Sequence, residues 1–188
     1  RQNKYQENLM TIQKQIKQIE NLVNEFSDFA RMPKPMFRIN NLVELLNLNI
    51  ELLKKTDQTI DISLNFSKDD NLNSSCDNEQ ISRVFFNLIK NSIESIQEKA
   101  LKTGNFAKKI VIEIKRINNY IAINIFDNGI GFASVKTKEL IKPYYTTKEK
   151  GSGLGLSIVN KIINDHNGTI EFNSDSLGTN ININLHIK

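Results

Sequence analysis

The sequence predicts an α+β fold, a two-layer sandwich in which a mixed sheet of about five strands packs on about three helices, preceded by a long bundle helix. Several short segments alternate apolar and polar residues, which is typical of half-buried strands. Longer segments between them carry apolar residues at steps of three and four, which is typical of amphipathic helices. Because several strands alternate, we expect helices to cover one sheet face and leave the other more open.

Bulk composition describes a folded domain with an appendage. The chain has 188 residues, of which 39% are hydrophobic. Its net charge of +4 is mild, and its basic residues are not interleaved with aromatic ones, which disfavours nucleic-acid binding. The single Cys76 excludes an internal disulfide and fits a reducing compartment. No apolar run approaches the roughly 18 residues of a membrane span, and Arg1 is not a natural start. We therefore expect a piece of a longer protein, whose other parts include membrane segments.

Residues 1–32 are predicted to form a helix with a narrow apolar stripe. Its apolar residues alternate steps of four and three, which is a heptad seam: Tyr5, Leu9, Ile12, Ile16, Ile19, Val23, Phe26 and Ala30. This pattern favours a helix of a dimeric bundle, and a helix lying on its own domain is the alternative. Pro33 and Pro35 end the helix, so we place a linker at 33–36 and a second domain at 37–188.

The first part of the second domain is predicted to hold a short strand at 37–40, a helix at 41–55, a strand at 59–66 and a polar loop at 67–75. The inward stripe of the helix is Leu42, Leu45, Leu46, Asn49 and Leu52 or Leu53. A second, longer helix runs from its cap Asp77 to about Lys99. Its predicted apolar face is Ile81, Val84, Phe85, Leu88, Ser92 and Ile96.

Asn87 and Asn91 lie one turn apart beside that apolar face, although asparagine is an indifferent helix former. One interpretation is drift in an Asn-rich sequence. The other is that both amides face a polar pocket and hold a hydrated Mg²⁺ with the phosphates near it, since Mg²⁺ takes oxygen ligands and keeps several waters.

The remaining predicted elements are strands at 109–117 and 120–126, a helix at 154–164, a strand at 169–173 and a last strand after Gly178. Asn118 and Asn119 suit a two-residue hairpin turn, because asparagine tolerates positive φ. His166 lies at the end of the helix, where the helix dipole favours a partly positive imidazole. His186 is expected to be solvated on the polar face of the last strand.

Between Asp127 and Leu156, two glycine clusters bracket a segment that is neither clearly helix nor clearly strand. Its second cluster leads directly into a helix, whose first N–H groups favour an anion. Glycines allow the backbone to approach phosphate oxygens. We therefore expect a nucleotide site with a mobile lid. Five lysines make the lid basic, either as a solvated loop or because one or two close over the phosphates: Lys136, Lys138, Lys142, Lys148 and Lys150.

Four blocks follow in order, NLIKN, DNGIGF, PYYTTK and GSGLGL. They resemble the N, G1, F and G2 boxes of the catalytic, ATP-binding domain of sensor histidine kinases, in the gyrase–Hsp90–histidine kinase–MutL superfamily. NEFSDFARMPKP and PYYTTKEKGSGLGLSIV are similar to the NtrY-type nitrogen-regulation sensor kinases. The resemblance implies a Bergerat-type ATP-binding fold from about residue 36 onward. The early helix resembles the second helix of the dimerisation and phosphotransfer domain.

The resemblance also implies ATP and Mg²⁺ as cofactors and assigns roles. Asn91 would ligate Mg²⁺, with Asn87 as its partner one turn earlier, and Lys90 would reach a phosphate. Asp127 would accept a hydrogen bond from the adenine amino group, and Thr179 would lie near the adenine. The other implied ATP-binding residues belong to glycine turns and the lid: Gly129, Gly131, Thr147, Lys148, Gly151, Gly153, Leu154 and Gly155.

Kinases of this family phosphorylate a histidine on the first bundle helix. Neither His166 nor His186 lies in such a motif. We therefore expect no catalytic residue in this chain, because the phosphoacceptor and the general base would lie upstream of it, and we expect no autophosphorylation by the chain alone.

As partners, the resemblance implies a homodimer through the N-terminal helix of the full-length protein, and a response-regulator receiver domain of the NtrX type that receives the phosphoryl group. It implies a cytoplasmic domain of an inner-membrane sensor. Two alternatives stay open. An ATPase clamp of the superfamily is disfavoured, because the nearest acidic residue before Asn87 is Glu79, two turns away. A non-catalytic ATP-binding scaffold is disfavoured by the intact blocks.

Overall fold

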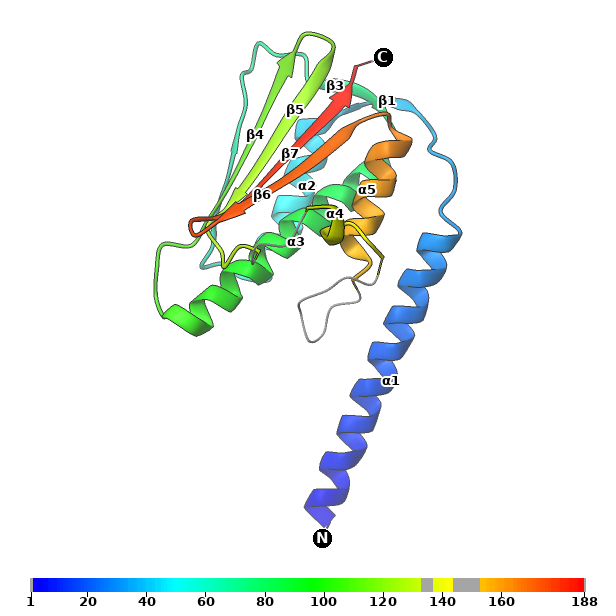
Figure 1. Cartoon of the computed structure of the whole chain (residues 1–188), viewed down its shortest axis with the longest axis vertical. Coiled ribbons are helices and arrows are strands. Elements are labelled where there is room, and N and C mark those ends of the chain that lie inside the picture. Colours follow the sequence, from blue (N-terminus) through cyan, green and yellow to red (C-terminus); the bar gives the residue numbers. More distant parts are fainter. Residues whose placement is uncertain (1, 133–136, 144–152, 188) are drawn as a thin grey trace.

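The computed structural model describes residues 2–132, 137–143 and 153–187, and the side chains of 5–132, 139–143 and 153–187. Helix α1 (Gln2–Ala30) projects away from a two-layer body of helices and sheet (Figure 1). The apolar stripe predicted on α1 faces solvent, with Ile16 and Ile19 each 60% exposed. In the described part of the chain, no helix is both long and apolar enough to cross a membrane.

The main sheet has five strands in the order β2-β4-β5-β7-β6. Their bounds are β2 (Asp61–Asn65), β4 (Lys109–Ile117), β5 (Tyr120–Asp127), β6 (Thr169–Asp175) and β7 (Gly178–His186). The β2–β4 pair is parallel and the other neighbours are antiparallel, so the sheet is mixed as predicted. The predicted β4–β5 hairpin turns at Asn118, which has a φ of 51°.

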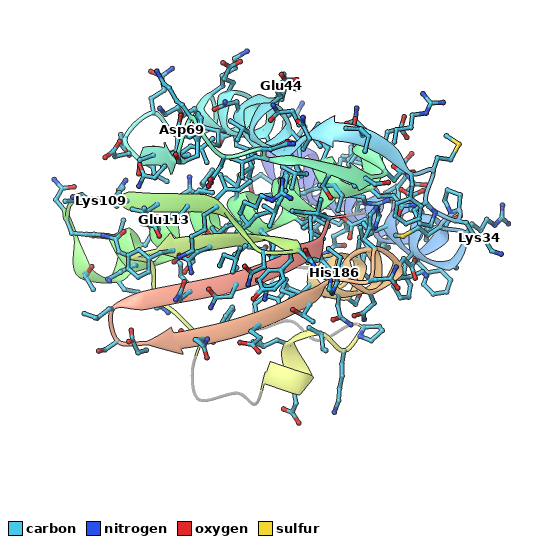
Figure 2. All side chains as sticks on the ribbon, turned by 90° about the horizontal axis from the view of Figure 1, so that it is seen from above. Lys34, Glu44, Asp69, Lys109, Glu113 and His186 are labelled. Carbon is cyan, nitrogen blue, oxygen red and sulfur yellow. The ribbon has the colours of Figure 1, made fainter. Side chains whose placement is uncertain are left out.

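Three helices cover one face of this sheet: α2 (Leu42–Lys54), α3 (Asn78–Thr103) and α5 (Gly155–Asp165) (Figure 1). Alternate residues of the strands point into the core between the layers, and the central isoleucines of β4, β5 and β7 are almost completely buried. Figure 2 looks onto the opposite face, where Glu113 and His186 are exposed. The prediction of one covered and one open face is thus confirmed, and so is a solvated His186.

The structure departs from the predicted polar loop at 67–75. Strand β3 (Asn73–Cys76) pairs antiparallel with β1 (Arg38–Asn41) and forms a small second sheet. Its sequence NSSC carries no apolar alternation, because the strand is defined by backbone pairing with β1. Cys76 is buried there, and burial raises the pKa of its thiol. A short helix, α4 (Thr137–Leu140), was not predicted either.

Two details of the helices go beyond the predictions. Of the predicted pair Leu52 or Leu53, Leu53 is buried and Leu52 is 55% exposed, and Ile50 joins the inward stripe of α2. His166 is buried at the end of α5. Its Nε2 accepts from the Asp77 N–H at 3.0 Å, and its Nδ1 lies 2.8 Å from the Ile162 carbonyl oxygen. The imidazole is thus held by a tertiary contact that its place at the helix end did not predict.

Candidate functional site

The carboxylate of Asp127 lies at the end of β5, where the chain leaves the sheet, and the residue is only 2% exposed. The Ser92 hydroxyl of α3 donates to its Oδ2 at 2.9 Å, and the Gly129 N–H donates to its Oδ1 at 3.0 Å. A buried carboxylate requires such donors, because an unpaired charge in the interior is costly. Strand, loop and helix together hold one anionic acceptor in a fixed orientation.

Thr179 of β7 lies directly opposite Asp127 in the β5–β7 ladder and is 3% exposed. Gly178, just before it, has a φ of 148°, and a Cβ there would collide with the Asp127 carbonyl oxygen. The close approach of these two strands therefore requires glycine. We call Asp127, Ser92, Gly129 and Thr179 the carboxylate end of the site.

The turn after Asp127 is docked on two neighbouring elements. The Ile130 N–H donates to Ser95 Oγ of α3 at 3.1 Å, and the Phe132 N–H donates to Ser174 Oγ of β6 at 2.7 Å. Gly131 has a φ of 73°, and a Cβ there would lie 2.6 Å from Ser174 Oγ. A Cβ at Gly129 would likewise overlap the Ser95 side chain. Both predicted turn glycines are therefore needed, because a Cβ at either position would overlap a neighbouring residue.

The other end of the site lies where α3 meets the start of α5. Asn87 donates from Nδ2 to the Arg83 carbonyl oxygen at 2.8 Å, which leaves its Oδ1 for another partner. A Cβ at Gly155 would lie 3.3 Å from this Oδ1, so the glycine keeps that space open. Leu154, fully buried at the N-cap of α5, anchors the helix start. We call Asn87, Asn91 and the start of α5 at Gly153–Gly155 the asparagine end.

An aliphatic N-cap residue has no side-chain oxygen that could accept from the first N–H groups of α5. Those N–H groups carry the positive end of the helix dipole and suit an anion. Gly153 has a φ of 69°, a conformation that favours glycine, in the turn that leads into α5. The predicted glycine turn and helix start are therefore present here.

The other residues predicted for the asparagine end make fewer described contacts within it. Asn91 is half-buried one turn beyond Asn87 on α3. Lys90 is exposed, and its Nζ lies 3.8 Å from Glu94 Oε1, so its contact with a phosphate stays a prediction. Thr147, Lys148 and Gly151 lie outside the described residues. Of the five lid lysines, only Lys142 has a described side chain.

The two ends present the complementary chemistry that a nucleotide and its metal need. The carboxylate end offers a buried anionic acceptor, and the asparagine end offers an amide oxygen beside backbone N–H groups. Amide oxygens are suitable ligands for Mg²⁺, so the residues present fit that ion. Among the residues that the structure describes, no three His, Cys, Asp or Glu side chains gather into a metal cluster.

The sequence pattern placed Ser92 on the apolar face of α3 without a role in the site. Ser95 and Ser174, which hold the turn after Asp127, were not predicted as part of the site. The available signal was a serine within an otherwise apolar stripe, since a hydroxyl buried there needs a partner. The identity of that partner, 35 residues away, is a tertiary fact.

Comparison with known proteins agrees with this geometry. Residues 76–188 match the family described as histidine kinase-, DNA gyrase B-, and HSP90-like ATPase. The chain is 33% identical over 178 residues to nitrogen regulation protein NtrY of Azorhizobium caulinodans, which covers 95% of the chain and 23% of that protein. It is also 33% identical to a putative sensor histidine kinase NtrY-like of Rickettsia bellii, covering 90% of the chain and 27% of the relative. The chain thus spans about a quarter of the length of these relatives.

Several solved structures with the same fold are histidine kinases. The catalytic domain of histidine kinase ThkA is 25% identical with a TM-score of 0.69, over 80% of this chain and 95% of that one. Acinetobacter baumannii histidine kinase AdeS, at 19% identity, shares the fold with a TM-score of 0.74 over 96% of this chain and 84% of that one. With the matched segment covering more than half of its length, the chain belongs to the histidine kinase-, DNA gyrase B- and HSP90-like ATPase family.

Proposed function

We propose that the chain is the ATP-binding catalytic part of a two-component sensor histidine kinase. The observation that carries this proposal is that one helix, α3, connects the carboxylate end of the site with its asparagine end. Through Ser92 and Asn87, α3 contacts both the buried Asp127 carboxylate and the start of α5. Such a site takes a base at one end and a charged phosphate chain at the other.

At the carboxylate end, Asp127 accepts a hydrogen bond from the amino group of adenine. Guanine carries an oxygen at that position of the ring, and two acceptors facing each other repel, so the same carboxylate rejects guanine. Gly129, Gly131 and Thr179 shape the space around the base. The burial of Asp127 supports this role, because the acceptor is shielded from water.

At the asparagine end, the N–H groups of α5 and its preceding glycine turn bind phosphate oxygens, with Lys90 as an additional cation. Asn91 and Asn87 hold Mg²⁺ with the phosphates. When bound, Mg²⁺ supplies charge neutralisation for the transferred phosphoryl group. The chain itself contributes positioning and electrostatic stabilisation. Thr147, Lys148 and Gly151 are further candidates for contact with the phosphates, on the resemblance of their sequence blocks alone.

The phosphoacceptor histidine lies on another segment of the full-length protein. The buried His166 is committed to the Asp77 N–H and the Ile162 carbonyl, and His186 lies on the open sheet face, away from the helices. The chain alone is therefore not expected to phosphorylate itself. A histidine kinase of known structure, ThkA, has been crystallised in complex with response regulator protein TrrA. By analogy, a receiver domain, of the NtrX type, accepts the phosphoryl group here.

Helix α1 is the second helix of a dimerisation and phosphotransfer domain, with the boundary at residues 33–36. Its apolar stripe is solvent-exposed along its whole length, with Tyr5 69% and Phe26 49% exposed. Burial of such a stripe in a homodimeric bundle would remove this apolar surface from water. Ile16→Asp should weaken dimerisation of the full-length protein, and an unchanged sedimentation coefficient at low concentration would contradict this assignment.

The domain is cytoplasmic and belongs to an inner-membrane sensor.

The kinase proposal is tested with γ-labelled ATP, Mg²⁺ and a separately supplied helix that carries an acceptor histidine followed by an acidic residue. We expect label on that histidine only when the chain is present, and no label on the chain itself. Asp127→Asn is the matched control and should strongly reduce the transfer at low ATP concentration. Release of free phosphate without transfer would instead indicate an ATPase clamp. Nucleotide binding without any chemistry would indicate a non-catalytic scaffold.

A further inference from the structure

Ser92 uses its hydroxyl in an unusual way for a serine within a helix. Serine and related side chains in helices commonly bond a backbone carbonyl of the preceding turn. Asn87, Asn49 and Thr103 all do so here, each to the carbonyl four residues earlier. Ser92 instead donates across 35 residues to Asp127 Oδ2, at 2.9 Å.

This contact is buried on both sides. Ser92 and Asp127 are each 2% exposed, so water does not compete for the hydrogen bond. The bond is charge-assisted, and such bonds are roughly twice as strong as neutral ones. The Gly129 N–H holds the other carboxylate oxygen at 3.0 Å. These two donors hold both carboxylate oxygens and so restrain the plane of the carboxylate.

We propose that Ser92 is a positioning residue that orients the Asp127 carboxylate toward the amino group of the base, and thereby sets the preference for nucleotides that carry this amino group. The proposal rests on the function proposed above and assigns specificity to a residue that does not itself need to touch the nucleotide. Because the Ser92 proton is donated to Asp127, this pair presents acceptors to the base, and only a donor on the base satisfies them.

The chain offers a matched control on the same helix. Ser82 of α3 is half-buried, and its Oγ accepts a hydrogen bond from Asn49 Nδ2 at 2.9 Å. It lies ten residues before Ser92, on the side of α3 that packs against α2. Ser82→Ala therefore removes the same atom from the same helix without touching Asp127.

The experiment compares two nucleotides on the wild-type chain, Ser92→Ala and Ser82→Ala. One is ATP, and the other is purine riboside triphosphate, which keeps the ring and phosphates but lacks the amino group. Calorimetric titration with Mg²⁺ gives both affinities. We expect Ser92→Ala to weaken the affinity for ATP roughly five- to tenfold and to leave the affinity for the analogue unchanged. The preference for ATP over the analogue should therefore fall. Ser82→Ala should change neither affinity.

Three results would overturn the inference or its basis. Equal weakening of both nucleotides by Ser92→Ala would make the contact merely structural, and urea unfolding would show the matching loss of stability. Unchanged affinity for both would show that Asp127 needs no help from Ser92. A wild-type chain that binds ATP no more tightly than the analogue would instead reject the role proposed for Asp127.

Discussion

The two ends of the site differ in how completely they are built before a ligand arrives. At the carboxylate end, Asp127, Ser92 and Thr179 are each at most 3% exposed and belong to three different elements. At the asparagine end, Asn87 and Asn91 are only half-buried, and Lys90 is exposed. The first end is made by cross-strand and helix–strand contacts, and the second by one helix face and one helix start.

This difference indicates how the proposed binding energy is distributed. A preformed polar contact costs little ordering on binding and favours selectivity. A half-exposed set of amides and N–H groups suits a phosphate chain with its metal and water, whose contacts are electrostatic. We therefore expect substitutions at the carboxylate end to change which nucleotide binds, and substitutions at the asparagine end to change how phosphate and metal contribute.

The largest effect is expected where the carboxylate end depends on backbone contact. Gly178→Ala would place a Cβ against the Asp127 carbonyl oxygen, so we expect a loss of at least about 2 kcal/mol in unfolding free energy, together with loss of ATP binding. Gly104→Ala is the control, because Gly104 has a φ of 82° but nothing within 4 Å of its Cβ position. Urea unfolding should show a smaller loss for Gly104→Ala and unchanged ATP affinity. Equal losses would mean that strain alone matters.

Asp127→Asn and Asn91→Ala separate the two ends directly. Asp127→Asn should weaken the binding of ATP, and also that of adenosine without metal, by about 1.5–3 kcal/mol, because a hydrogen bond to a charged acceptor is lost. Asn91→Ala should weaken the binding of ATP only when Mg²⁺ is present and should leave the binding of adenosine unchanged. Titrations with and without Mg²⁺ measure both. The assignment of the two ends is wrong if Asn91→Ala weakens adenosine.

Gly155→Ala should move stability and affinity in opposite directions. Alanine is a better helix former than glycine, which adds up to about 1 kcal/mol to the unfolding free energy. Its Cβ would lie 3.3 Å from Asn87 Oδ1, so the asparagine would have to shift by a few tenths of an ångström, and ATP binding should weaken a few-fold. Thermal unfolding and ATP titration of one variant test this. A rise in both quantities would show that the space beside Asn87 is not used.

The smallest effect is expected at Asp77, which lies away from both ends at the N-cap of α3. Partial burial raises its pKa, but the N–H groups of Gln80 and Met36 donate to its carboxylate, and the net result is a pKa below the ordinary 3.8. The charged form therefore stabilises the fold above this ordinary value, and the contribution is lost as the pH falls through the lower folded value. Asp77→Asn should be modestly less stable than the wild type at about pH 7, and this difference should shrink as the pH falls below the ordinary value of 3.8. A difference that persists in acid would contradict this cause, and ATP affinity should not change.

Much of the fold follows from local patterns in the chain. The cap Asp77 and the stripe from Ile81 to Ile96 predicted α3, because a buried helix face requires apolar residues at steps of three and four. The isoleucines of β4 and β5, and the asparagine turn between them, predicted the hairpin. The same patterning predicted the α1 helix and favoured a dimeric bundle for its apolar stripe, and the bundle stays a prediction.

Local patterns located the groups of the candidate site separately, and only the resemblance to histidine kinases joined them in one ATP site. The end of β5 and the glycines at 153 and 155 could be located, because a strand end and a helix start leave local signals. Strand β3 could not be predicted, since its pairing with β1 needs no apolar alternation. The contact of His166 could not be predicted, because the Asp77 N–H that donates to its Nε2 is 89 residues away.

By itself, the sequence determined most of the elements, their order and the residue types available for chemistry, since these depend on neighbours along the chain. Only the tertiary structure decided that Ser92 donates a hydrogen bond to Asp127 and that Gly155 faces Asn87. It also decided that position 178 has no room for a Cβ beside Asp127. Such contacts join groups far apart in sequence. Their strength comes from burial, which exists only once the helices have packed on the sheet.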